Sequence, residues 1–220
     1  PGGFALQLNT QTLNMEVWTK TSGSPASLHI VPFSIMPNQW DRIALVLERT
    51  MGTQADLHVY IDGVRQLSAS VGYEQPSSIP LFIGTNRSMD QHFSGNLDQI
   101  RISKIARFSS PTYNHYPAPL LDDPDTQGIW PLNESVVNPL EFEDIANGFH
   151  LTAFEVEAAQ TQFNPFWNPP DPTPAPYTYV TPVFNFTNQW TVEFWYKRLT
   201  NNSGVILDAL DGSPNGYELA

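Results

Sequence analysis

The chain contains no cysteine among its 220 residues. This absence excludes a disulfide framework, a thiolate metal site and a cysteine nucleophile. It does not exclude an extracellular protein, because a domain of this size can be stable through its hydrophobic core alone.

Basic residues are also scarce, since 10 Lys and Arg stand against 22 Asp and Glu and give a net charge of −12. A chain this acidic is repelled by the phosphate backbone of nucleic acids. The sequence also lacks a basic amphipathic stretch that would bind a membrane surface. It has no run of about 18 apolar residues that would predict a membrane-spanning helix. We therefore expect neither a nucleic-acid partner nor membrane insertion.

The apolar residues that are present recur with a period of two. Leu57, Val59 and Ile61 alternate with more polar neighbours, and Asp62 and Gly63 then supply the positive φ angles of a two-residue hairpin turn. Residues 190–198, "WTVEFWYKR", alternate in the same way. No stretch has a convincing helical pattern, so the sequence predicts an all-β protein.

Two stretches interrupt the strand pattern. Residues 108–128 carry Pro, Asp and Tyr without alternation, which predicts a linker lying over the surface. Residues 163–182, "FNPFWNPPDPTPAPYTYVTP", are rich in proline, which removes backbone donors and favours extended polyproline II. We expect a stiff loop there and no central strand.

Four motifs occur in order along the first half of the chain. They are "WDRIALV" from Trp40, "VYIDG" from Val59, "LFIG" from Leu81 and "FSGNLDQIRIS" from Phe93. This series resembles the C-terminal half of a laminin-G-like, concanavalin A-like lectin/glucanase domain. The resemblance implies a jelly-roll β-sandwich of two antiparallel sheets.

The second half resembles the beginning of another such domain. "FEDIANGFHLTA" at 142–153 and "WTVEFWYK" at 190–197 carry this similarity. The chain also begins with "PGGFALQ" and ends with "PNGYELA", in which Gly216 follows Gly3 by 213 residues. We therefore expect residues 1–107 to be the C-terminal part of one module, 108–128 a linker, and 129–220 the N-terminal part of the next. The alternative is that 129–220 closes onto 1–107 as one permuted sandwich.

Some relatives of this fold are glycosidases, so paired carboxylates would be the sign of catalysis. The glucanase branch needs three acids on one face of a strand. The nearest match, Glu141, Glu143 and Asp144, lacks the third acid in that pattern, and none of the histidine spacings predicts a zinc site. We expect no enzymatic activity, unless Glu193 lies beside two other carboxylates on the sheet.

Asp98 is the candidate for an ion site. It shares strand phase with Ile100 and Ile102, so its side chain is expected to point inward, where a charge needs a partner. The resemblance suggests Ca²⁺ bound by oxygen atoms of Asp98, Asp144 and Asn147. A structural hydrogen bond to backbone amides or to Arg101 is the alternative.

Aromatic residues of the proline-rich stretch are candidates for ligand contact. In a stiff loop such rings can stack on sugar faces or dock a partner. Alternatively, they cover the edge of the sandwich. The candidates are Phe166, Trp167, Tyr177 and Tyr179.

The resemblance implies an adhesion or scaffold module of a large repetitive protein, outside the cell, on the cell surface or on a virion, such as a phage tail or surface appendage. Its expected partners are neighbouring modules or subunits and surface glycans. One alternative is a carbohydrate-binding module of a secreted polysaccharide-degrading enzyme. Another is a purely structural fibre or shell subunit.

Overall fold

The computed structural model describes most of the chain, and every element in this part is a strand. The described residues are 2–9, 12, 14–34, 36–75, 80–88, 91–115, 119–132, 141–154, 178–183, 186, 188–199 and 203–210. The strands are β1 Gly3–Asn9, β2 Asn14–Lys20, β3 Ser27–Ser34, β4 Trp40–Met51, β5 Gln54–Ile61, β6 Val64–Gly72, β7 Pro80–Ile83, β8 Gly95–Ser103, β9 Thr126–Trp130, β10 Glu141–Phe142, β11 Leu151–Phe154, β12 Thr178–Val183, β13 Gln189–Arg198 and β14 Gly204–Asp208.

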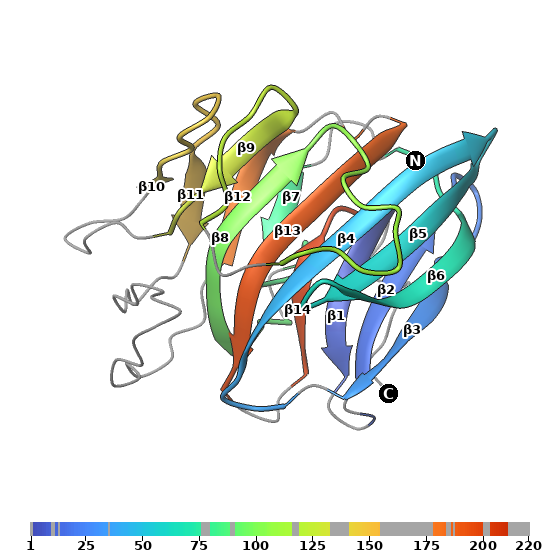
Figure 1. The fold of residues 1–220 in the computed structure, drawn as a ribbon, viewed down its shortest axis with the longest axis horizontal. Helices are drawn as coiled ribbons and strands as arrows, with labels where there is room; N and C mark the ends of the chain where they lie inside the picture. The colour runs from blue at the N-terminus through green and yellow to red at the C-terminus, as the bar shows by residue number, and fades with distance from the viewer. Residues whose placement is uncertain are drawn as a thin grey trace.

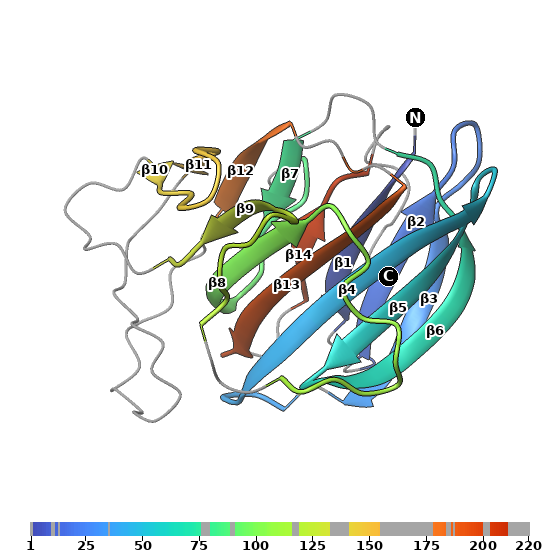
Figure 2. The same cartoon turned by 45° about the horizontal axis from the view of Figure 1, so that its top comes forward.

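The strands form two antiparallel sheets that pack face to face (Figures 1 and 2). The eight-stranded sheet has the order β10-β11-β12-β7-β14-β1-β2-β3. The six-stranded sheet has the order β6-β5-β4-β13-β8-β9. The predicted all-β sandwich of two antiparallel sheets is confirmed.

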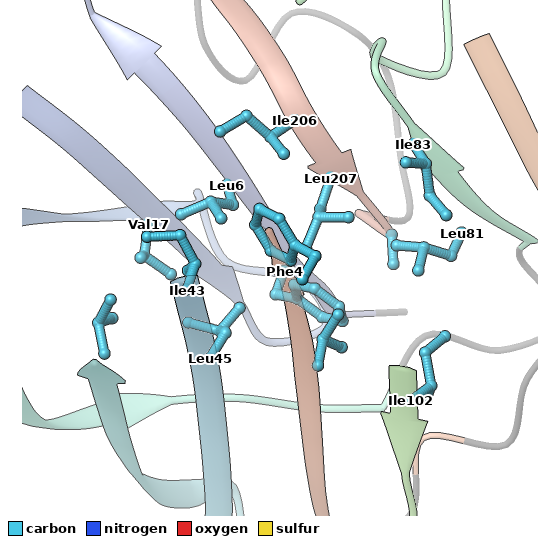
Figure 3. Close-up of a cluster of buried hydrophobic side chains, with 14 of the residues drawn as sticks. Phe4, Leu6, Val17, Ile43, Leu45, Leu81, Ile83, Ile102, Ile206 and Leu207 are labelled. Atoms are coloured by element: carbon cyan, nitrogen blue, oxygen red, sulfur yellow. The ribbon is translucent and has the colours of Figure 1, made fainter. Parts of the chain in front are cut away.

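The core lies between the sheets and follows the alternation seen in the sequence. Phe4 and Leu6 of β1 and Ile43 and Leu45 of β4 have no exposed surface and face one another across the sandwich (Figure 3). The ring of Phe4 also stacks on that of Trp190, with centroids 4.4 Å apart. Each such side chain contributes about 1.5–3 kcal/mol through the apolar surface that it buries.

The β5–β6 hairpin has the turn that its sequence predicts. Asp62 and Gly63 adopt φ angles of 49° and 74°. The Asp62 carboxylate also accepts a hydrogen bond from the backbone N–H of Arg42 at 2.9 Å, which ties the turn to the start of β4.

The two halves of the chain complete one sandwich. β13 lies between β4 and β8, and β14 lies between β7 and β1. This is the closure of 129–220 onto 1–107 that was the alternative expectation. The prediction that residues 1–107 and 129–220 are parts of two successive modules applies to a longer parent chain, and it stays a prediction. Residues 214–220, which repeat the pattern of β1, lie outside the described residues.

The stretch predicted as a linker lies over the surface only in part. Its residues Ser110 and Thr112 run across the outer face of the six-stranded sheet, where the Tyr60 hydroxyl donates to the Ser110 carbonyl at 2.9 Å. The other end of the stretch is already a strand, because β9 begins at Thr126 and pairs with β8.

The proline-rich stretch was predicted to be a loop throughout, and this is wrong for its last residues. They belong to β12, which pairs with β11 on one side and with β7 on the other. Proline is tolerated in this strand because Pro182 falls in the register shift between Val180 and Val183 of the ladder with β7.

Candidate functional site

Asp98 is buried, at 3 % exposure. It was predicted to share a face of the strand with Ile100 and Ile102, and this is wrong. Gln99 has a φ of 48°, and the ladder between β8 and β13 shifts register at this point. Asp98 is therefore the cross-strand partner of Trp195. The residues on either side of Trp195 in β13, Phe194 and Tyr196, point into the core, so Trp195 and Asp98 point away from it. The bulge turns the Asp98 side chain to the outer face of the six-stranded sheet.

Asp144 caps the turn between β10 and β11. Its Oδ1 accepts the backbone N–H groups of Ile129 at 2.8 Å and Ala146 at 3.0 Å. Its Oδ2 accepts those of Asn147 at 3.1 Å and Phe149 at 2.9 Å. A carboxylate has about four acceptor positions, so these four bonds use the whole group.

Asn147 fastens the same turn to β9. Its side-chain amide donates to the carbonyls of Thr126 at 3.1 Å and Gln127 at 3.0 Å. In the part of the chain that the structure describes, no group of three or more His, Cys, Asp or Glu side chains is arranged to hold a metal ion. Asp144 and Asn147 make structural contacts within the turn and to β9, and calcium binding by Asp98, Asp144 and Asn147 stays a prediction.

We expect Asp144→Asn to lower the free energy of unfolding by about 2 kcal/mol, because an amide nitrogen cannot accept the two N–H groups that it would face. Urea denaturation measures this loss, with exposed Asp122→Asn as the matched control. If the two variants are equally stable, the capping role of Asp144 is wrong. Repeating the urea denaturation with Ca²⁺ and with EDTA tests the calcium prediction, because a bound ion would stabilise the wild-type chain and the Asp122→Asn control more than Asp144→Asn.

Glu193, in the middle of β13, has no exposed surface and lies between two guanidinium groups. Arg42 of β4 donates to its Oε1 at 2.7 Å, and the Arg101 Nε of β8 donates to its Oε2 at 3.0 Å. Both arginine side chains are at most 10 % exposed. The three residues form a buried charge cluster on the outer face of the six-stranded sheet, and we call it the Glu193 cluster.

The segment after β8, residues 104–115, covers this cluster, and we call it the crossing segment. Arg107 within it lies 3.9 Å from Glu193 and forms two hydrogen bonds to Asp123, at 2.8 and 2.7 Å. The Arg107 guanidinium holds the pKa of the Asp123 carboxyl well below its usual range. Figures 1 and 2 show the crossing segment passing over β4 and β5.

Aromatic rings hold the crossing segment in place. Phe108 and Tyr113 stack on each other at 3.7 Å, and both rings meet Tyr60 of β5 edge-on. Tyr60, Ala44 and the two rings belong to a second small core, separate from the one between the sheets. The outer face of the six-stranded sheet is therefore closed by the chain itself over β4 and β5.

Asp41 is the inward-facing carboxylate that sequence reasoning missed. It pairs in register with the core residue Tyr196 and is 1 % exposed. Burial, together with the nearby Asp62 carboxylate, raises its pKa to about 6. The signal was present in the sequence, because Asp41 continues the strand phase of Ile43 and Leu45.

The predicted ligand-binding aromatics are not brought together in the described part of the chain. Phe166, Trp167 and Tyr177 lie outside the described residues. Tyr179 is in β12, where its backbone pairs with Ile83 and Ala153, so it belongs to the sheet and not to a loop.

Comparison with known proteins agrees with this architecture. The laminin-G-like family model of the concanavalin A-like lectin/glucanases superfamily matches residues 1–110, which is half of the chain. The chain belongs to this superfamily. No curated protein and no solved structure gives a significant match.

Within the lectin/glucanase superfamily, the Glu193 cluster bears on the question of catalysis. Glu193 would have suggested a glucanase site if two other carboxylates had flanked it, but its neighbours are arginines. Both of its oxygens are occupied and the side chain is fully buried, so a sugar cannot reach it.

None of the described segments forms a helix long and apolar enough to cross a membrane.

Proposed function

We propose that this laminin-G-like chain is a non-enzymatic adhesion or scaffold module of a large repetitive protein. Its place would be outside the cell, on the cell surface or on a virion, for example in a phage tail or surface appendage. The observation that carries the proposal is the Glu193 cluster. The superfamily includes lectins and glucanases, and in this chain the acid in the middle of β13, Glu193, is held in ion pairs with Arg42 and Arg101.

Because the crossing segment covers the outer face of the six-stranded sheet over β4 and β5, a ligand would bind elsewhere on the molecule. The crossing segment buries Tyr60 and Ala44, so this part of the sheet cannot accept a ligand. Binding would then use the loops or the eight-stranded sheet. The proposed ligands are surface glycans, which flat aromatic rings bind through apolar contact with the sugar face. Phe166, Trp167 and Tyr177 are the proposed contacts, and covering the sandwich edge is their alternative role.

A glycan array followed by calorimetry with each glycan that binds tests the proposal. We expect a bound glycan to remain intact, and Trp167→Ala to weaken its binding at least about tenfold, which is about 1.4 kcal/mol. The control is Met51→Ala, at the exposed apolar residue that ends β4. Cleavage of the glycan would overturn the non-enzymatic role. Equal glycan binding by both variants would exclude Trp167 as a contact residue. Repeating the assay in EDTA tests whether glycan binding depends on calcium.

A second candidate is a purely structural module that binds only its neighbours in a fibre or shell. The edge strand β3 favours it, because Leu28 and Ile30 are 41 % and 50 % exposed there. Apolar residues on a sheet edge favour pairing with another chain. This role predicts no bound glycan, and Ile30→Lys would then reduce self-association. The remaining alternative, a carbohydrate-binding module of a polysaccharide-degrading enzyme, needs a catalytic domain elsewhere in a longer chain.

A further inference from the structure

Three polar side chains of β8 and β13 are buried close to one another. Asn96, Asp98 and Lys197 are 5 %, 3 % and 4 % exposed. Lysine and aspartate are seldom buried unless they interact with another polar or charged group. Lys104, in contrast, is exposed, as is usual for lysine. We call Asn96, Asp98 and Lys197 the Lys197 triad.

The register of the β8–β13 ladder places the Lys197 triad on one face of the sheet. Asn96 is the direct cross-strand partner of Lys197, and Asp98 follows Asn96 by two residues on the same strand. Between these positions, Leu97 and its partner Tyr196 pack into the core. Because side chains alternate along a strand, the Lys197 triad lies on the outer face of the six-stranded sheet.

The Lys197 side chain is long enough to reach both other members of the triad. Directly opposed residues of antiparallel strands have Cβ atoms about 4.5–5.5 Å apart, and diagonal neighbours lie about 7–8 Å apart, within reach of long side chains. Two aromatic residues share this face, Trp195, which is 6 % exposed, and Trp40, which is the partner of Lys197 on β4. The amine therefore lies beside an amide and a carboxylate in surroundings shielded from water.

The side-chain amide of Asn96 is the group that this arrangement leaves unsatisfied. Its Nδ2 is buried and has no hydrogen-bond partner among the described residues. Burying such a donor costs free energy, since it loses its hydrogen bonds to water. A lysine amine opposite the amide carbon of an asparagine is a nucleophile opposite an electrophile, and Nδ2 is the group that would leave.

We propose that Lys197 and Asn96 are joined by an isopeptide bond, which links β13 covalently to β8. Asp98 first accepts a proton from the Lys197 ammonium group. The neutral amine then attacks Cγ of Asn96, and the Nζ–Cγ bond forms. Asp98 donates its proton to Nδ2 and accepts the second proton from Nζ, and the Cγ–Nδ2 bond breaks. The released ammonia takes up this proton and leaves as ammonium, so the step needs no oxidant, reductant or cofactor.

The fold itself supplies the driving arrangement for this reaction. Holding two reacting groups side by side raises their effective concentration far above that of groups free in solution. β8 belongs to the first half of the chain and β13 to the second, so the bond would join the two halves covalently. This inference goes beyond the proposed function and does not rest on it, because glycan binding and bond formation are measured separately.

Intact-mass spectrometry of the purified full chain tests the bond. We expect a mass about 17 Da below that of the sequence, which is the mass of one ammonia molecule. Digestion with trypsin after denaturation should release a cross-linked pair of peptides, one with Asn96 and the other with Lys197, because trypsin does not cleave after an acylated lysine. Sequencing this pair by fragmentation locates the bond.

Three variants assign the roles. Lys197→Arg should have the full mass of its sequence, because a guanidinium group does not form this amide. Lys104→Arg is the matched control and should keep the loss of ammonia. Asp98→Asn should slow bond formation at least about a hundredfold, as is typical when a general acid–base group is removed. If the Asp98→Asn chain forms the bond as fast as the wild-type chain, Asp98 does not carry the proton.

A wild-type chain with the full mass of its sequence, both when fresh and after prolonged incubation, would overturn the proposal. A loss of ammonia that persists in Lys197→Arg would overturn it as well. In that case the ammonia comes from another site, such as cyclisation of Asn147 onto the backbone nitrogen of Gly148. The cross-linked peptide pair distinguishes the two reactions, because cyclisation joins no distant residues.

Discussion

We expect Glu193→Gln to lower the free energy of unfolding by about 3–5 kcal/mol, which is the cost of removing one partner from a buried ion pair. The substitution keeps the shape of the side chain but removes its charge. The buried guanidinium group of Arg42 then loses its carboxylate partner, and that of Arg101 keeps only the Asp123 carboxylate, 3.9 Å away. Urea denaturation followed by tryptophan fluorescence measures the change.

The control is Glu48→Gln, the same substitution at an exposed position of the neighbouring strand β4. We expect it to change stability by no more than about 0.5 kcal/mol, as is usual for surface sites. A Glu193→Gln variant as stable as this control would mean that the Glu193 cluster is solvated in solution. In that case the face of the six-stranded sheet would be open, and the argument against a catalytic role for Glu193 would fail.

The strands and their inward faces were predictable because they depend on local sequence. The alternation around Leu57 and around Trp190 identifies strands that the structure contains, and the Asp62-Gly63 turn follows from the φ angles that only a few residues tolerate. The order of the strands depends on contacts between distant residues. That β13 inserts between β4 and β8 follows from complementarity of whole strands, which no local pattern records.

The ion pairs of the candidate site illustrate the same limit. Glu193, Arg42 and Arg101 each occupy the polar phase of their own strand, and in isolation each is typical of a solvated face. Only the strand order places the three side chains together. The crossing segment then covers them, although its residues 108–115 were predicted only as part of a surface linker.

Asp98 and Asp41 show when the alternation along a strand predicts the direction of a side chain and when it does not. The Asp98 prediction assumed an unbroken strand, and the bulge at Gln99 invalidates it. Nothing in "NLDQIRIS" marks that bulge, because glutamine seldom adopts a positive φ. Asp41, in contrast, lies on a regular strand, and counting back from Ile43 would have found it.

We expect Asp41→Asn to stabilise the protein at pH 8 by up to about 3 kcal/mol, the free energy that corresponds to a pKa raised from 3.8 to about 6. The folded state holds the Asp41 proton more tightly than the unfolded state does. The wild-type chain is therefore most favoured below pH 4, and its stability falls as the pH rises through 6. The variant lacks this titration, so its advantage grows between pH 4 and pH 6 and is then constant.

Denaturant melts of both chains at intervals from pH 4 to pH 8 measure this difference. Subtracting the two curves removes the titration of His29 and His58, whose pKa values burial lowers and which are present in both chains. Asp122→Asn, at an exposed carboxylate, is the control and should run parallel to the wild-type curve. A difference between Asp41→Asn and wild type that does not change with pH would mean that Asp41 stays ionised in the folded state. The inward carboxylate of Asp41 would then be stabilised by water or by a cation. The surroundings of Asp41, at the beginning of β4, would be the next place to look for a bound ion.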